Sequence, residues 1–234
     1  MNILEYAVIR KMVGGGSGEP FVVLDGESPT ADDLATAKYR LNCPAATSID
    51  ANAFENCDNL TAIDLPVATS IGDGAFGNCS SLTAIDLPVA TSIVERAFSN
   101  CTSLTAVNLP VATSIGGSAF GNCSSLTAID LPVATSIGVD AFYSCTNLIT
   151  IILRKSDAIC NMNLTAILDT KIATVEGVPT GEGFIYVPTA LFEDYVANFV
   201  VQITTGFGFD EATADYIARA VLRKIEDYPE ICGS

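Results

Sequence analysis

The sequence predicts a mainly β repeat solenoid with an α/β cap at its C-terminal end. The segment Leu-Thr-Ala-Ile-Asp-Leu-Pro-Val-Ala-Thr-Ser-Ile begins at Leu60 and recurs almost unchanged at Leu82, Leu104 and Leu126. Each copy continues through an Ala-Phe pair to a cysteine, so that the period is 22 residues. A fixed period of this length is typical of a solenoid, in which each repeat buries its apolar residues only against its neighbours.

Residues 1–19 form the first region of the chain. Asn2 and Glu5 make a capping box for a short helix over residues 3–12. The glycine-rich residues 14–18 that follow have the composition of a flexible tether. The segment is therefore either a docking or oligomerising helix on a tether, or a frayed terminus.

Residues 20–40 form the predicted N-terminal cap. The run 21–24, Phe-Val-Val-Leu, predicts a strand, and Thr30 is placed to cap a short helix that ends near Lys38. A cap is required here because the first repeat of a solenoid would otherwise expose its apolar face to water.

Residues 41–153 form the repeats, beginning with a degenerate copy that is in register with the others. The alternation Ile63-Asp64-Leu65 indicates a strand with two side chains inward and one outward, and Pro66 ends it. A second short strand is predicted at 69–71, on the opposite side. Stacking the repeats predicts a ladder of inward phenylalanines, which are Phe54, Phe76, Phe98, Phe120 and Phe142.

Five of the eight cysteines also fall on the repeat period, namely Cys57, Cys79, Cys101, Cys123 and Cys145. A cysteine fixed among apolar neighbours behaves as a small buried hydrophobe. Neighbouring rungs lie about 4.8 Å apart, further than the ~3.8 Å Cβ separation of a disulfide. We therefore expect five buried, free thiols, with Cys43, Cys160 and Cys232 outside the series.

Residues 154–234 form the predicted C-terminal cap. A strand is expected at 184–188, followed by a helix over 189–199. Asp210 is placed to cap a last helix over 211–225. The apolar side of that helix would be formed by Ile217, Val221, Leu222 and Ile225.

The repeat Leu-x-x-Ile-x-Leu-Pro-x-x-x-Ser-Ile-x-x-x-Ala-Phe-x-x-Cys-x-x-Leu resembles the leucine-rich repeats of the BspA-like, or Treponema-type, family of bacterial surface proteins. It differs from the general leucine-rich pattern because its ninth position is alanine, as at Ala68. The resemblance therefore implies a flatter solenoid with strands on both sides, in place of a horseshoe with an asparagine ladder and convex helices. It also implies attachment to host proteins or cell surfaces, and an extracellular, cell-surface or virion-associated location.

The composition narrows the classes of partner. The formal net charge is −16, and Arg96 is the only basic residue between Arg40 and Arg154. Such a surface disfavours nucleic acid and favours a basic partner or a divalent cation. No apolar run reaches the ~20 residues of a membrane helix, and no secretion signal is visible at the start.

The sequence offers little for catalysis. It contains no histidine, which is the commonest general base and metal ligand. The ladder cysteines lack the paired base that a nucleophile needs, and no phosphate loop, dinucleotide fingerprint or C-x-x-C pair is present. We therefore expect neither an enzyme nor a bound cofactor or metal.

Two surface features remain as candidate partner-binding sites. The first is an outward column on the main sheet, Asn42, Asp64, Asp86, Asn108 and Asp130. Its aspartates would repel one another, and this is consistent either with a bound cation or with a solvated polar surface. The second is the turn at which the copies disagree, where Glu95 and Arg96 replace small residues; this edge is either irrelevant or tuned for recognition.

Two functions are consistent with these features. The first is a non-enzymatic binding or adhesion module that presents the solenoid surface to a protein or cell-surface ligand. The alternative is a structural component of a phage tail or surface assembly, anchored by its N-terminal helix. A homo-oligomer formed through residues 1–19 is consistent with either function.

Overall fold

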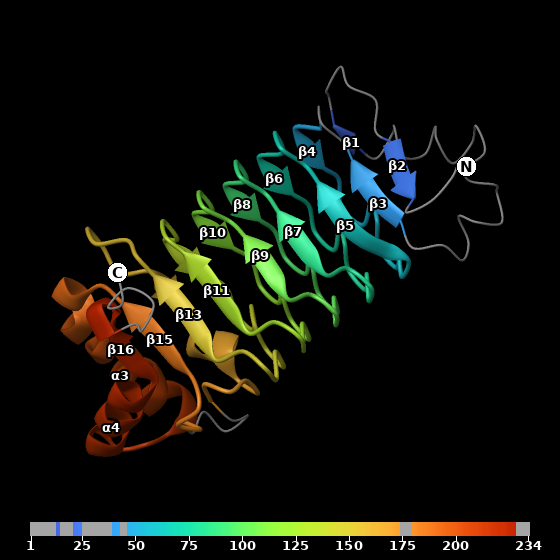
Figure 1. The fold of residues 1–234 in the computed structure, drawn as a ribbon. Coiled ribbons are helices and arrows are strands. Elements are labelled where there is room, and N and C mark those ends of the chain that lie inside the picture. The colour runs from blue at the N-terminus through green and yellow to red at the C-terminus, as the bar shows by residue number, and fades with distance from the viewer. Residues whose placement is uncertain (1–12, 15–20, 25–38, 43–45, 174–178, 228–234) are drawn as a thin grey trace.

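The computed structural model describes residues 13–14, 21–24, 39–42, 46–173 and 179–227, with backbone alone before residue 46. It is an elongated coil of stacked rungs, each formed by one repeat, with helices at the C-terminal end (Figure 1). The helices predicted at 3–12 and after Thr30 lie outside the described residues. Gly14, predicted as part of a tether, belongs instead to strand β1 (Val13–Gly14).

The first face of the coil carries the longer strands. Within the described residues these are β2 (Phe21–Leu24), β3 (Tyr39–Asn42), β5 (Leu60–Asp64), β7 (Ala84–Asp86), β9 (Ala106–Asn108), β11 (Ala128–Leu131) and β13 (Thr150–Leu153). The strand predicted at Phe21–Leu24 is confirmed and runs antiparallel to β3. From β3 onward the pairing is parallel, in a sheet that ends at β9 and a second sheet that begins at β11.

The second face carries two-residue strands, as predicted. These are β4 (Ser48–Ile49), β6 (Ser70–Ile71), β8 (Ser92–Ile93), β10 (Ser114–Ile115), β12 (Ser136–Ile137) and β14 (Asn161–Met162). They pair in parallel, serine opposite serine and isoleucine opposite isoleucine over the regular repeats, while β1 adds antiparallel to β4 at the edge. The predicted class, a mainly β solenoid with strands on both sides, is confirmed.

A stack of phenylalanine rings runs along the axis of the coil. The five rings from Phe54 to Phe142 have centroids 5.3 to 5.7 Å apart, and neighbouring planes lie within 9° of parallel. Phe76, Phe98, Phe120 and Phe142 are fully buried. Each ring therefore contacts the same residue of the next rung, and the stack holds the 22-residue spacing.

An asparagine ladder accompanies the rings, at a repeat position other than the ninth, which is alanine here. Asn78 donates its amide to the Asn56 Oδ1 at 3.0 Å, and Asn100 donates to the Asn78 Oδ1 at 2.8 Å. These residues have φ near +60°, in the left-handed region that asparagine tolerates better than other side chains. The repeat thus moves the ladder to the turn after the phenylalanine.

The coil continues past residue 153 although the sequence pattern has decayed there. Asn161 is in register with Ser136, and the Phe142 amide donates to the Ala166 carbonyl at 2.9 Å, as earlier phenylalanines do to earlier alanines. Asn161 lies 25 residues after Ser136 in place of 22, and Ala166 lies 24 residues after Phe142 in place of 21, so this rung has three extra residues. The few extra residues obscure the period, and the 3-10 helix η1 (Leu164–Ile167) completes this rung.

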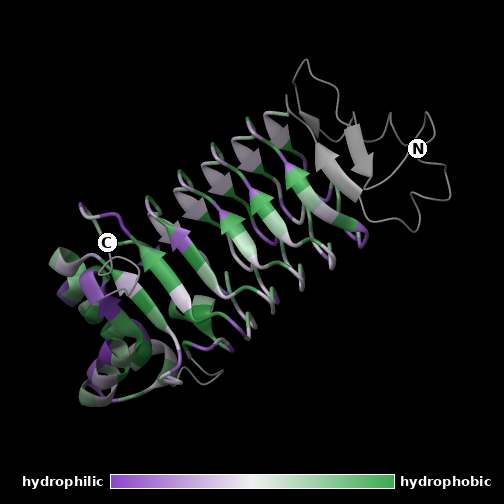
Figure 2. Ribbon diagram, viewed as in Figure 1, coloured by the Kyte–Doolittle hydropathy of each residue, from purple (hydrophilic) through white to green (hydrophobic). Residues whose placement is uncertain are grey.

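Two helices close the C-terminal end. The predicted strand is confirmed as β15 (Phe184–Val187), and the helix after it, comprising η2 (Thr189–Leu191) and α3 (Phe192–Phe207), extends beyond the predicted end. The last helix α4 (Glu211–Val221) begins at the predicted cap Asp210, whose side chain accepts from the Thr213 amide. Figure 2 shows that these helices carry both hydrophobic and hydrophilic residues.

The predicted end of the last helix, residue 225, is wrong. Leu222 is extended and begins strand β16 (Leu222–Lys224), which pairs in parallel with β15; η3 (Ile225–Asp227) follows. Arg223 donates to the carbonyls of Arg219 and Ala220, so its guanidinium satisfies the C-terminal end of α4. Backbone pairing with the open edge of β15 thus replaces the further helical turn that the sequence predicts.

The ladder cysteines are free, and four of the five are fully buried as expected. Cys57, in the first rung, is only partly buried, which corrects the prediction for that residue. The four buried ladder thiols each donate to the carbonyl of the phenylalanine in the rung before, 25 residues earlier, at 3.0 to 3.3 Å. Burial raises the pKa of Cys101 and of Cys160 to about 12.

Replacing Phe98 by alanine should lower the free energy of unfolding by about 3–5 kcal/mol, because it opens a cavity within the ring stack. The measurement is the urea midpoint. The control is Val89→Ala, at an exposed position, which should change stability by about 0.5 kcal/mol or less. Equal midpoints for the two variants would place Phe98 outside the core.

The thiols should react slowly in native protein and rapidly in denaturant. Because the folded pKa of Cys101 lies above that of the unfolded thiol, its contribution to stability is complete below about pH 9 and is lost as the pH rises towards 12. Thiol titration and urea midpoints between pH 7 and 11 measure both effects. Rapid reaction of Cys79, Cys101, Cys123 and Cys145 without denaturant would contradict the ladder.

Candidate functional site

The predicted outward column is assembled by the parallel register of the first face. Asp64 lies opposite Asp86, and Asp86 lies opposite Asn108. Asn42 lies opposite Asp64 in the backbone register. Asp64, Asp86 and Asn108 are exposed while the isoleucines beside Asp64 and Asp86 are buried, so the column points into solvent as the alternation predicts.

One of the three carboxylates in this column is ion-paired within the protein, and a second accepts a hydrogen bond. Asn108 donates to the Asp86 Oδ1 at 2.8 Å. Arg154 reaches the Asp130 carboxylate with its Nε at 2.9 and 3.1 Å, and the two groups form an ion pair. Over the part of the chain that the structure describes, no three acidic or cysteine side chains gather as a metal site. The geometry favours a solvated polar row over a cation ladder.

The row changes character after Asp130. In the second sheet Asp130 lies opposite Ile152, Ile152 opposite Tyr186, and Tyr186 opposite Arg223. Ile152 and Tyr186 are only 4% and 8% exposed. The exposed acidic row therefore ends at Asp130 and Arg154, and it occupies the four central strands β5, β7, β9 and β11.

A second row was not identified from the sequence. The valine after each repeat proline is 37 to 41% exposed although it is apolar. These residues are Val67, Val89, Val111 and Val133. Each follows the acidic-row residue of its own rung by three positions, so the two rows run side by side along the coil. The available signal was a strictly repeated apolar residue that lies off the inward alternation.

The variable turn lies apart from the acidic row. Glu95 and Arg96 follow β8 on the second face, and their side chains are 53% and 61% exposed. They form an ion pair at 2.5 Å, and the hydrogen bonds that Arg96 donates to the Glu95 carboxylate raise the pKa of Arg96. Arg96 has φ +54°, at a position that holds Asn52, Gly74 or Ser118 in other rungs. The candidate residues thus form two surfaces.

A polar groove of about 620 Å³ lies where the second face meets α3. Ser114, Ser136, Asn161 and Asn198 contribute to its walls. Gln202 crosses it, donating to the Met162 carbonyl at 2.9 Å and accepting from the Leu164 amide at 2.7 Å. Because Gln202 holds α3 to the last rung, this groove is part of the attachment of the cap.

Several solved structures are similar to this chain. A leucine-rich repeat protein from Bacteroides ovatus is 25% identical, with a TM-score of 0.51 over 73% of this chain and 46% of that protein. The T. pallidum leucine rich repeat protein is 23% identical, with a TM-score of 0.49 over 68% and 76%. A leucine rich cell surface protein from Faecalibacterium prausnitzii is 22% identical, with a TM-score of 0.29 over 62% and 58%.

This chain thus spans about half of the B. ovatus protein. No curated protein sequence matches it. None of the helices in the described residues has the length and apolar composition of a membrane span.

The repeats match a sequence profile over residues 47–175, in six copies, which extends past residue 153 through the irregular rung described above. The profile is that of the BspA type leucine rich repeat region, and it covers more than half of the chain. The chain belongs to the BspA-type leucine-rich repeat family.

Proposed function

We propose that this protein is a non-enzymatic adhesion module that attaches to a protein or cell-surface partner through its exposed acidic and valine rows. The leucine-rich repeat solenoid is consistent with a protein-binding module, because stacked rungs present a long continuous surface. The observation that carries the proposal is the register of Asp64, Asp86 and Asn108, which repeats one exposed polar group beside one exposed valine.

The chemistry of these rows suggests the kind of partner. Asp64 has no side-chain partner among the described residues, and the valine row offers apolar contact next to it. A basic surface with small apolar side chains would complement both rows. Thr83, Ala84 and Ala106, on the side of the acidic row away from the valines, add only small exposed side chains, without the tryptophan, tyrosine and arginine anchors of tight interfaces.

Affinity for a single module should therefore be modest. Attachment in several copies would strengthen it, since linked sites gain a factor of roughly 10² to 10⁴ through avidity. A structural role in a phage tail or surface assembly is the second candidate. A groove between α3 and α4, lined by acids that include Glu193, Glu211 and Asp215, favours this role because it is a second surface on which another copy could dock.

Replacing Asp64, Asp86 and Asp130 together by asparagine should weaken attachment about tenfold. This follows if each carboxylate of the acidic row contributes about 0.5 kcal/mol to the free energy of binding. The loss should be larger at low salt, because exposed charges are screened beyond about 8 Å at physiological ionic strength. Attachment to immobilised host-cell surface protein, with and without 0.5 M salt (roughly a 4 Å screening length), measures both effects.

The matched control replaces Glu55, Asp194 and Asp227, which are exposed acids outside the row and outside the variable turn, by their amides. It removes the same charge and should leave attachment nearly unchanged. A third variant, Glu95→Gln with Arg96→Ala, tests the variable turn separately. If the control and the row variant lose attachment equally, only net charge matters; if only the turn variant loses it, recognition lies on that edge.

A further inference from the structure

A groove of about 830 Å³ lies between α3 and α4, at the end of the molecule opposite β1 (Figure 1). Its apolar lining consists of Val196, Ala197, Val200, Val201 and Ala212. Its charged lining consists of Glu193, Asp210, Glu211, Asp215 and Arg219. Val201 is 60% exposed, so the apolar part is open to solvent.

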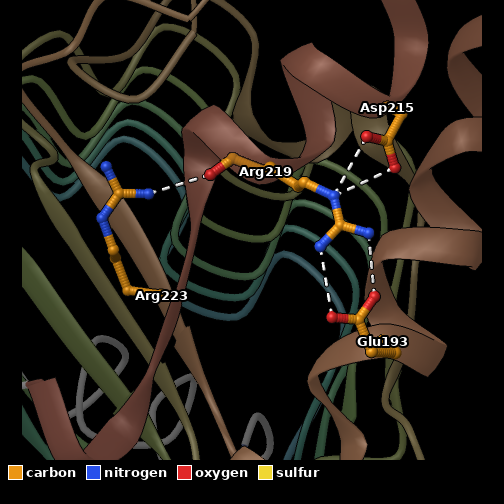
Figure 3. A network of polar contacts seen from close by, with 4 residues as sticks. All are labelled: Glu193, Asp215, Arg219 and Arg223. Carbon is orange, nitrogen blue, oxygen red and sulfur yellow. Dashed lines mark hydrogen bonds and ion pairs between the residues drawn. The ribbon is translucent and has the colours of Figure 1, made fainter. Parts of the chain in front are cut away.

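The rim of this groove remains acidic because its one cation is engaged. Arg219 binds the Glu193 carboxylate through both terminal nitrogens, at 2.9 and 3.2 Å, and reaches Asp215 through its Nε at 3.0 Å (Figure 3). These hydrogen bonds raise the pKa of Arg219 and lower that of Glu193. Glu211 is exposed at the mouth. A complementary occupant therefore carries apolar side chains beside positive charge.

The first twelve residues of the chain have this composition. Their apolar residues are spaced as on one side of a helix and are Ile3, Leu4, Val8, Ile9 and Met12. The adjacent cations Arg10 and Lys11 lie between Ile9 and Met12. The other adjacent basic pairs begin at Arg154, which binds Asp130, and at Arg223, which holds the end of α4. The arginines of those two pairs already make hydrogen bonds within their own chain.

As a helix, residues 1–12 would be too short to reach the groove between α3 and α4 of their own copy. Val13 pairs with Ile49 at one edge of the seven-stranded sheet that the structure describes, and α3 is held at β14 on the other edge. Five rung spacings, about 24 Å, separate β4 from β14. A helix of twelve residues is only about 18 Å long. Residues 1–12 can therefore occupy this groove only in a second copy.

We propose that residues 1–12 of one copy dock in the groove between α3 and α4 of another, so that copies join head to tail. The contact uses different surfaces on its two sides, so repetition extends the chain of copies unless the geometry closes a ring. The acidic and valine rows lie outside this contact and stay exposed in every copy. The assembly would thus supply the several linked sites that a weak adhesion surface needs, but it does not depend on that function.

The test begins with the full chain in a concentration series measured by light scattering. The parent should gain mass with concentration. A donor variant, Arg10→Ser with Lys11→Ser, and an acceptor variant, Val201→Gln with Glu211→Lys, should each need at least about tenfold more protein to reach the same mass. A parent that stays monomeric throughout overturns the proposal.

Matched controls separate docking from general charge or stability effects. Asp194→Lys reverses an exposed acid in the first turn of α3 outside the groove, as Glu211→Lys does in the first turn of α4. Val89→Gln changes an exposed valine on the solenoid. Both controls should assemble like the parent, and circular dichroism should show all variants folded. Equal loss of assembly in the controls overturns the proposal.

Mixing the donor and acceptor variants gives the decisive result. The donor variant keeps its groove and the acceptor variant keeps its N-terminal segment, so one contact can form between them and cannot be extended. A 1:1 heterodimer is therefore expected where neither variant assembles alone. If the mixture stays monomeric while the parent assembles, the contact lies elsewhere. Adhesion of the monomeric variants, measured separately, tests the proposed function independently.

Discussion

Each rung of the coil must place its backbone amides opposite the carbonyls of a neighbouring rung, because nothing else within the narrow core can satisfy them. The Phe76 amide donates to the Ala97 carbonyl and the Phe98 amide to the Ala119 carbonyl, both at 2.8 Å. On the second face the Thr91 and Thr113 amides repeat the same step in the opposite direction, at 2.9 Å. This spacing, set once for all rungs, is the constraint on which the fold, its ladders and its surface rows depend.

The constraint explains why the repeats are copied so closely. A phenylalanine ring and a left-handed asparagine each contact the same residue type in a neighbouring rung, and each buried ladder thiol donates to a phenylalanine carbonyl of the rung before it. A change in one rung therefore affects its neighbours as well. Positions outside these contacts are free to vary, as at Glu95 and Arg96. The valine row is an exception, as are the exposed alanines Ala84, Ala106 and Ala128, since both are copied strictly but exposed. That combination makes the valine row part of the candidate recognition surface.

The cap solves the problem that every solenoid has at its end. The last rung would leave its apolar interior open, and α3 covers it with Tyr195 and Phe199, both almost fully buried. The Tyr195 hydroxyl accepts from the Cys160 amide at 2.7 Å, while burial raises the pKa of Tyr195 to about 12. Covering the solenoid with the inner sides of two helices leaves their outer sides exposed, and the acid-rimmed groove is formed there.

The sequence by itself determined the solenoid, its period, both strand faces, the phenylalanine and cysteine ladders and the outward direction of Asp64 and Asp86. These follow from local alternation repeated at a fixed interval, so one repeat predicts all the others. Tertiary structure alone decided the irregular rung after residue 153, the strand at Leu222, the ion pair of Arg154 with Asp130 and the groove beside Val201. Each of these features joins segments that share no sequence period. Which segments come into contact depends on the open sheet edge and the exposed interior of the last regular rung.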